Sequence, residues 1–290
     1  MKQLLKLYTC CLLLLLFISS CEKEANIDIP KQPRKLVVTS FISPQDSQLT
    51  VSVTLSTPLF ETDPDNNAFD YVTDAIVSMS DGITTQVFTY NASVQLYTLP
   101  ASQLPVVAGK TYHLKIATPD GKYAEAHCIV PVPGNQTPVL SALDSVELRS
   151  GATEYRFKIN YTDQPGITNF YRLGAQVKAV NGQIFSAVAG NDPTNILQGS
   201  VLDDDTKQSG AEIIHRFTHE FYDYLSSPDS LHIDLLITDE PYYRFHSTLL
   251  SHLQAKNNPF AEPVLIYSNI NGGLGCFAAY IRKTSAIDIP

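Results

Sequence analysis

The sequence predicts a mainly β protein: an N-terminal immunoglobulin-like sandwich, followed by a second β-rich sandwich or barrel-like domain with one amphipathic helix. Three observations predict this fold class. Short segments alternate apolar and polar residues with period two, turn-forming residues separate them, and one segment after the N-terminal leader has helical spacing. About seven short strands in ~100 residues, joined by regularly spaced turns, are typical of an immunoglobulin-like sandwich.

The first predicted domain covers residues 36–133. Residues 111–132 predict a hairpin, because Thr118–Gly121 reads Thr-Pro-Asp-Gly, in which proline fixes φ and glycine accepts a positive φ. Period-two alternation predicts further strands at 36–42, 49–55, 75–80, 84–90 and 93–99.

The second predicted domain covers residues 134–290, after a boundary rich in proline. Strands are predicted at 155–161, 171–180, 183–189, 213–221 and 231–238. Asn181-Gly182, between the second and third of these, is the dipeptide favoured in two-residue hairpin turns. The helix is predicted near 240–256, since Asp239 can cap it and Pro241 fits its first turn. Its apolar face comprises Tyr242, Phe245, Leu249 and Leu253. The last strands are predicted at 264–268 and 276–282.

The N-terminus has the pattern of a bacterial lipoprotein leader. Two lysines precede an apolar run at 12–18, and two serines lead directly to Cys21. The run is far shorter than the ~20 residues that span a bilayer as a helix. The pattern resembles the lipobox of Bacteroidota lipoproteins, which implies a signal peptide at 1–20, lipidation of Cys21 and a lipidated tether at 21–35. The charged residues 22–24 resemble the signal that sends such lipoproteins to the cell surface.

Composition and cysteine content limit the partner classes. The 290 residues carry a formal net charge of −9, which argues against nucleic acid, because that partner requires clustered Lys and Arg. Beyond the leader and Cys21, the remaining cysteines are Cys128 and Cys276. Both lie in apolar, strand-like segments. They are interpreted as two buried thiols, with a disulfide between them as the alternative.

The sequence contains no recognisable catalytic set. Metalloprotease, nucleophile-elbow and P-loop motifs are absent, and no nucleophile, base and orienting group can be assembled. We therefore expect a protein that is not an enzyme, has no catalytic residues and needs no cofactor. The alternative is a hydrolase whose site is assembled from distant residues.

Two acidic segments have oxygen ligands that could bind a metal ion. Asp63, Asp65, Asn67 and Asp70 have the alternating oxygen spacing of a calcium loop. They lack the glycine at position six and the bidentate glutamate at position twelve, so a polar turn is the other interpretation. The second segment, 203–205, is interpreted as a solvated acidic loop.

Two aromatic-rich stretches could line a binding surface, because tyrosine combines a flat apolar body with a polar tip. The alternative is that these rings pack in the cores, since the chain has no tryptophan. The candidate surface comprises Tyr222, Tyr224, Tyr242, Tyr243 and Arg244.

The C-terminal residues carry a family resemblance. The chain reads NPFAEPV at 258–264, IYSNI at 266–270 and GGLGCF at 272–277. These segments resemble the closing signature of the domain of unknown function 4249 family of Bacteroidota lipoproteins. The opening LVVTSFI and the segment TYHLKIATPDGKYAEA also fit. The resemblance covers essentially the whole chain after the leader.

The resemblance implies a lipid-anchored outer-membrane protein, exposed at the cell surface and encoded beside a TonB-dependent receptor. By analogy with other such pairs, it implies a non-catalytic accessory or ligand-capture partner in uptake of an unknown small nutrient. Gly272, Gly273, Leu274 and Gly275 then form either a receptor-contact loop or a structural turn. A cell-surface adhesion or scaffold module is the alternative function.

Overall fold

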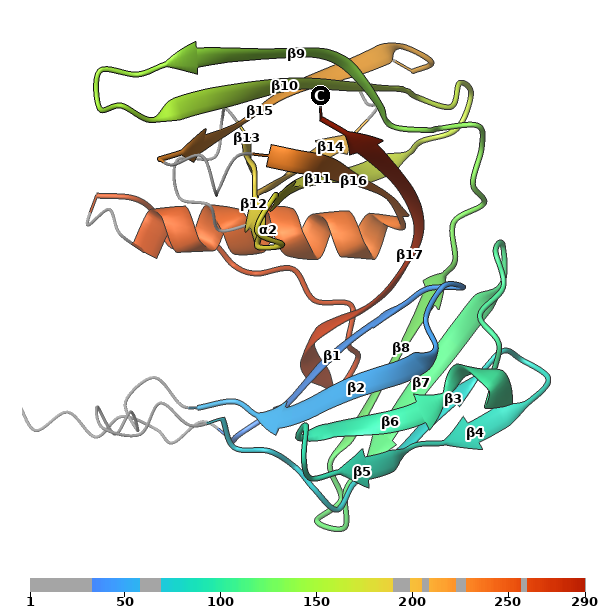
Figure 1. Ribbon diagram of the computed structural model, residues 1–290. Coiled ribbons are helices and arrows are strands. Elements are labelled where there is room, and N and C mark those ends of the chain that lie inside the picture. The colour runs from blue at the N-terminus through green and yellow to red at the C-terminus, as the bar shows by residue number, and fades with distance from the viewer. Residues whose placement is uncertain are drawn as a thin grey trace, which may run out of the picture. The chain divides into compact units, whose positions relative to one another are not determined.

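The computed structural model describes residues 33–57, 69–189, 199–204, 209–222, 228–256 and 260–289. A compact unit begins at Arg34, and its strands form one nine-stranded sheet and two four-stranded sheets (Figure 1). The nine-stranded sheet is shared by two sandwiches, each of which is closed by one of the smaller sheets.

The first sandwich contains the strands of the N-terminal half. Its strands are β1 (Leu36–Ile42), β2 (Gln48–Leu55), β3 (Ile76–Ser80), β4 (Thr85–Val87), β5 (Thr89–Asn91), β6 (Leu96–Pro100), β7 (Thr111–Ala117) and β8 (Tyr123–Ile129), with a short helix η1 (Ala101–Gln103). The order β4-β3-β7-β8 forms the small sheet, and β1, β2, β6 and β5 belong to the large one. The alternating residues of both sheets meet in one apolar core.

The second sandwich contains the strands of the C-terminal half. Its strands are β9 (Val139–Glu147), β10 (Thr153–Thr162), β11 (Phe170–Ala179), β12 (Ile184–Ser186), β13 (Val188–Ala189), β14 (Ser200–Asp204), β15 (Glu212–Phe221) and β16 (Pro228–Thr238). The small sheet has the order β13-β15-β10-β9. A second core lies between it and β11, β14 and β16. Of the two predicted forms, the second half therefore adopts the sandwich.

The last strand, β17 (Gly273–Asp288), connects the two sandwiches within the nine-stranded sheet. The strand order of this sheet is β12-β11-β16-β17-β1-β2-β6-β5, and its ninth strand, β14, pairs with β11. The first half of β17 pairs in parallel with β1, from Leu36 opposite Gly273 to Ile42 opposite Ala279. Its second half pairs antiparallel with β16. Figure 1 shows this strand curving from beside β1 to beside β16. Because it contributes to both sandwiches, we expect them to unfold together.

The helix α2 (Glu240–Lys256) packs on the outer face of the large sheet. Its predicted cap is confirmed, because Asp239 Oδ1 accepts a hydrogen bond from the Tyr242 amide at 3.0 Å. The second Asp239 oxygen accepts the Ala279 amide at 3.0 Å. Asp239 therefore fixes the helix start onto β17 as well as capping it.

The strand pattern was predicted only in part. The strands at 36–42 and 49–55 and the hairpins at 111–132 and at Asn181-Gly182 are confirmed. The strand predicted at 84–90 is instead β4 and β5, which belong to different sheets, and the strand predicted at 93–99 begins at Leu96.

Two differences concern the C-terminal part. Residues 264–268 belong to no strand, and the Tyr267 amide donates to Thr248 Oγ1 of α2, at 2.9 Å. The last strand is longer than the predicted 276–282, because it extends from Gly273 to Asp288.

Candidate functional site

The predicted aromatic surface is dispersed in the structure. Tyr242 is 4% exposed, and its ring meets Phe41 edge to face with centroids 5.1 Å apart. Tyr222 is 70% exposed and donates to Glu220. Tyr224 lies outside the described residues. The helix needs its apolar face to pack on β17, so Tyr242 belongs to the core and not to a binding surface.

The two remaining residues of that surface point to different neighbours. Tyr243 donates a hydrogen bond to Asp204 at 2.9 Å, and burial with this carboxylate raises its pKa to about 12. Arg244 lies over the ring of Tyr267, 4.2 Å from its centroid, and pairs with Glu240. Both residues therefore brace α2 against neighbouring segments.

The glycine run at 272–275 is mostly strand and not the predicted loop, because β17 begins at Gly273. A Cβ on Gly272 would lie 2.4 Å from the Tyr123 carbonyl oxygen. A Cβ on Gly275, whose φ is +110°, would lie 2.0 Å from the Val38 oxygen. Backbone approach to β1 and β8 thus explains these glycines. Leu274 is 39% exposed, and its contact with a receptor stays a prediction.

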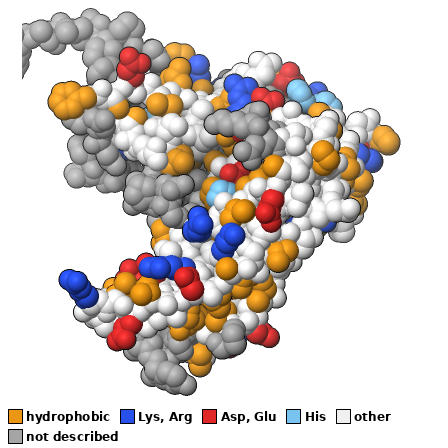
Figure 2. All heavy atoms as spheres, turned by 90° about the horizontal axis from the view of Figure 1, so that it is seen from above, with side chains coloured by type: hydrophobic (Ala, Val, Ile, Leu, Met, Phe, Trp, Pro, Cys, Tyr) orange, Lys and Arg blue, Asp and Glu red, His pale blue; other side chains and the backbone are white. Residues whose placement is uncertain are grey.

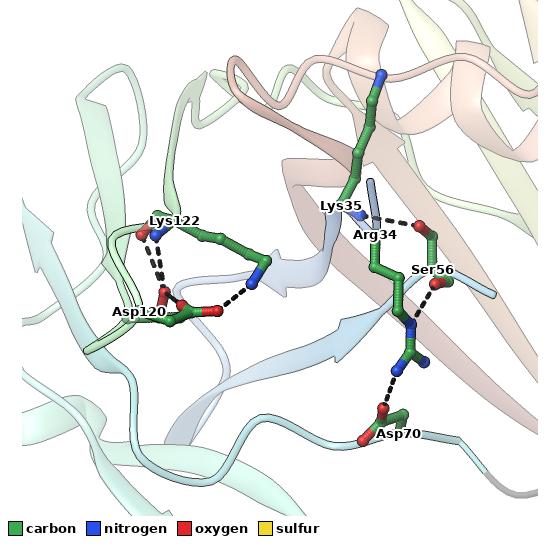
Figure 3. A network of polar contacts seen from close by, with 7 residues as sticks. Arg34, Lys35, Ser56, Asp70, Asp120 and Lys122 are labelled. Atoms are coloured by element: carbon green, nitrogen blue, oxygen red, sulfur yellow. Dashed lines mark hydrogen bonds and ion pairs between the residues drawn. The ribbon is translucent and has the colours of Figure 1, made fainter. Parts of the chain in front are cut away.

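The candidate calcium loop falls largely outside the described residues, which include Asp70 but not Asp63, Asp65 or Asn67. Arg34 binds the Asp70 carboxylate, with 2.6 Å between nitrogen and oxygen (Figure 3). Across the described ranges, no three His, Cys, Asp or Glu side chains are grouped to hold a metal.

The same contacts lie at the start of the compact unit, which begins at Arg34. Arg34 Nε donates to the Ser56 carbonyl at 3.0 Å, and the Lys35 amide donates to Ser56 Oγ at 2.9 Å. Figure 3 shows this network and the separate Asp120–Lys122 ion pair. Residues 34 and 35, which the sequence assigned to the tether, are thus hydrogen-bonded to the folded body.

The pair of acidic residues at the end of β14 is not the solvated loop that the sequence suggested. Asp203 accepts hydrogen bonds from Tyr161 at 2.9 Å and contacts His215 Nε2 at 2.6 Å. Burial raises the pKa of Tyr161 far above its usual range. Since Tyr161 and His215 belong to the opposite sheet, Asp203 links the two layers of the second sandwich. Asp205 lies outside the described residues.

The two remaining cysteines are free and buried. Burial raises the pKa of both thiols. Cys276 Sγ lies 3.6 Å from the Pro241 carbonyl, at the start of α2. A protonated, enclosed thiol is a poor nucleophile, so neither side chain is a candidate catalytic group.

A polar hollow of about 170 Å³ lies on the outer face of the large sheet, beside α2. The register of the paired strands determines which residues line the hollow. Arg172, Leu236 and Arg282 form one row across β11, β16 and β17, because Arg172 is opposite Leu236 and Leu236 is opposite Arg282. Gly174 and Asp234 form the next row, about 6.6–6.8 Å along the strands. The lining residues are Arg172, Gly174, Ala175, Gln176, Ser200, His232, Asp234, Leu236 and Arg282.

Hydrogen bonds fix the orientation of the charged side chains that line the hollow. Arg172 Nε donates to Ser200 Oγ at 2.8 Å, and its Nη1 donates to the Tyr242 hydroxyl at 3.0 Å. Asp234 Oδ1 accepts from Thr284 Oγ1 at 2.8 Å. These contacts hold two charged groups close to Gly174: Arg172, two residues away on the same strand, and Asp234, opposite it on β16. The hollow thus presents charges of both signs in fixed positions.

A second hollow of about 360 Å³ lies in the first sandwich, lined in part by Leu55, Tyr71 and Asp120. Leu55 and Tyr71 flank residues 58–68, which lie outside the described residues. The wall of the first hollow comes from regular strands, so we take that one as the candidate functional site.

Sequence reasoning missed this site. The outward positions of two predicted strands already carried the signal, because Arg172 and Gln176 flank a glycine and His232 and Asp234 lie two residues apart. What the sequence did not provide was the pairing of β16 with β17. That pairing alone brings Arg282 beside them.

Comparison with known proteins identifies the family. A family model described as a domain of unknown function (DUF4249) matches residues 22–286. The chain belongs to this family, as its C-terminal residues predicted. No curated protein matches it. Within the described residues, no helix is both long and apolar enough to cross a membrane.

Solved structures resemble the chain only distantly. A mutant of Salmonella alpha-2-macroglobulin is 12% identical, with a TM-score of 0.23, and the match covers 90% of this chain and 15% of that one. A chitinase from Bacillus thuringiensis is 14% identical, with a TM-score of 0.18, over 66% and 28% of the two chains. The full-length major pilin SpaD from Corynebacterium diphtheriae is 10% identical, with a TM-score of 0.22, over 74% and 63%. The chain spans less than two thirds of each.

Proposed function

We propose that this protein is an outer-membrane lipoprotein, anchored by lipid on Cys21 and exposed at the cell surface. It acts as a non-catalytic accessory of a TonB-dependent transporter and captures a small nutrient for it. The observation that carries the proposal is the leader that ends in Ser-Ser-Cys, followed within a few residues by a compact body. Membrane attachment through more than one acyl chain would be stable.

Two features of the body support ligand capture. The hollow on the sheet face presents fixed charges of both signs at a concave surface, as small-molecule sites do. The visible surface also intersperses basic, acidic and hydrophobic side chains (Figure 2), in agreement with a formal net charge of −9. Such a surface suits a protein or nutrient partner better than nucleic acid.

The anchor and the partner are tested on the same preparation. Membranes are solubilised gently, the tagged full chain is purified, and both its intact mass and its co-purifying proteins are determined by mass spectrometry. We expect a chain that begins at lipidated Cys21, together with a TonB-dependent receptor. A Cys21→Ser variant is the matched control and should lose both the lipid and membrane attachment. An unmodified thiol at Cys21, or purification without any receptor, would contradict the corresponding half of the proposal.

A further inference from the structure

The charges that line the hollow do not neutralise one another. Asp234 is bonded through one oxygen to Thr284. Among the described residues, the guanidinium of Arg282 donates one long hydrogen bond, 3.5 Å to the Tyr280 hydroxyl. It also lies 5.8 Å from the centroid of that ring and interacts electrostatically with the Asp46 carboxylate. Among the residues described, neither side chain takes part in an ion pair. A cation and an anion therefore line one hollow, and each keeps hydrogen-bonding capacity toward a ligand.

The strand register places these two charges within reach of one small molecule. Asp234 is opposite Thr284, and Leu236 is opposite Arg282. Asp234 and Arg282 are therefore diagonal neighbours on one face, with Cα atoms about 7–8 Å apart. Arg172 is the corresponding diagonal neighbour on the other side of Asp234. One carboxylate thus lies between two guanidinium-bearing positions.

Gly174 provides the space between them. A glycine inside a strand costs about 0.5–1 kcal/mol relative to alanine. Its backbone does not have a positive φ, and an added Cβ would make only ordinary contacts, 3.5 Å from the Ser200 Cβ. The pairing of β11 with β16 continues past it without a bulge. Neither backbone conformation nor packing requires glycine, which leaves close approach of a ligand as its role.

We infer that the hollow binds a small zwitterion of the α-amino acid class, its carboxylate on Arg282 and its ammonium group on Asp234. This assignment rests on the proposed ligand-capture function. A simple anion would bring negative charge toward Asp234, and a simple cation would face two arginines. A zwitterion satisfies both signs. The volume of about 170 Å³ is below the ~300–1,000 Å³ of drug-sized pockets, so the ligand is small.

Calorimetric titration of the purified full chain in detergent tests the charge requirement. The probes are alanine, propionate and ethylamine, which share a carbon skeleton and differ in their charged groups. We expect alanine to bind at least about tenfold more tightly than either partial analogue, because each analogue leaves one charged group unmatched. Equal binding of propionate and alanine would overturn the zwitterion assignment. Absence of binding by alanine and larger amino acids would also overturn it.

Three variants localise the binding. Arg282→Gln and Asp234→Asn should each weaken alanine binding about tenfold or more, and Gly174→Val should abolish it by filling the hollow. Arg216→Gln, at an exposed position of β15, is the matched control and should bind as wild type does. Thermal unfolding of each variant verifies that it is folded. Retained affinity in a folded Gly174→Val variant would place the ligand elsewhere. The titration uses the isolated chain. Absence of alanine binding would therefore contradict the zwitterion site but would leave the expected co-purification with a receptor unchanged.

Discussion

Two neighbouring parts of one sheet face differ in what covers them. Under α2, the outward residues Cys276 and Ala278 are buried against Tyr242. Beyond the helix, the outward residues include Gly174 on β11 and Asp234 on β16, and they line an open hollow. Both parts belong to the nine-stranded sheet and follow the same period-two alternation. The alternation therefore decides which residues face outward, and only the position of the helix decides which of them are enclosed.

This difference indicates which part of the sheet face is available to bind a ligand. The part under the helix joins the two sandwiches, since Asp239 bonds both the helix and β17. Gly174 and Asp234, beyond the helix, belong to none of the apolar cores, so substitutions of these two residues should cost little packing. We therefore expect substitutions in the first part to change stability and substitutions in the second to change binding.

The largest effect is expected from Gly275→Ala. Its φ of +110° and the short approach to the Val38 oxygen should cost about 3 kcal/mol or more of the free energy of unfolding. Urea denaturation followed by circular dichroism measures this. Gly174→Ala is the matched control and should be unchanged or more stable by about 0.5 kcal/mol. If the two variants were equally stable, the parallel pairing of β17 with β1 would be wrong.

The next effect concerns the helix contact. Tyr242→Ala should cost about 3 kcal/mol, because it leaves a cavity beside Phe41. Tyr242→Phe retains the ring and should lose only about 1 kcal/mol, from the hydrogen bond with Arg172. Amide hydrogen exchange should show faster exchange in α2 for the alanine variant. Unchanged protection of α2 would show that the helix does not depend on this contact.

A pH-dependent effect is expected at Asp239. Burial raises its pKa to about 7, against about 3.9 in an unfolded chain. At this residue the folded state therefore binds more protons than the unfolded state between these values. The contribution of Asp239 to stability should fall as pH rises from about 4 to 7, by at most about 1.4 kcal/mol per unit.

Asp239→Asn removes this titration. Its amide oxygen can still cap the helix, but its NH2 group cannot accept the Ala279 amide, so the variant also loses that hydrogen bond. His246 contributes with the opposite sign, because burial lowers its pKa to about 4 against about 6.5 in an unfolded chain, so its contribution to stability rises with pH between these values. In urea unfolding measured from pH 4 to 8, stability should therefore rise more steeply with pH in Asp239→Asn than in the wild type. An unchanged slope would contradict the raised pKa of Asp239.

The smallest effect is expected at Arg34, where the compact unit begins. The Arg34–Asp70 ion pair is partly exposed, and exposed pairs contribute about 0–1 kcal/mol. Asp70→Asn should therefore change the free energy of unfolding by less than about 1 kcal/mol, and 0.5 M salt should reduce even this difference. A larger loss would show that residues 34–35 contribute more to the fold than their exposure suggests.

The sequence predicted local structure better than the site. Period-two patterns located the strands, and Asp239 with Pro241 located the helix, because these signals act within a few residues. The parallel pairing of Leu36 with Gly273 joins residues far apart in sequence, and no local signal specifies it. The sequence allowed Tyr242 to be either a surface residue or a core residue. Its packing against Phe41 in the structure shows that it is a core residue. The hollow required three strands in register, so it could not be predicted.

The measurement that tests the account most directly is nuclear magnetic resonance of the isotope-labelled chain titrated with alanine. We predict that the amide signals of 172–176, 232–236 and 282–284 shift progressively, while those of 243–253 in α2 stay in place. Shifts confined to α2, or no shifts at saturating alanine, would contradict a ligand site on the open part of the sheet face.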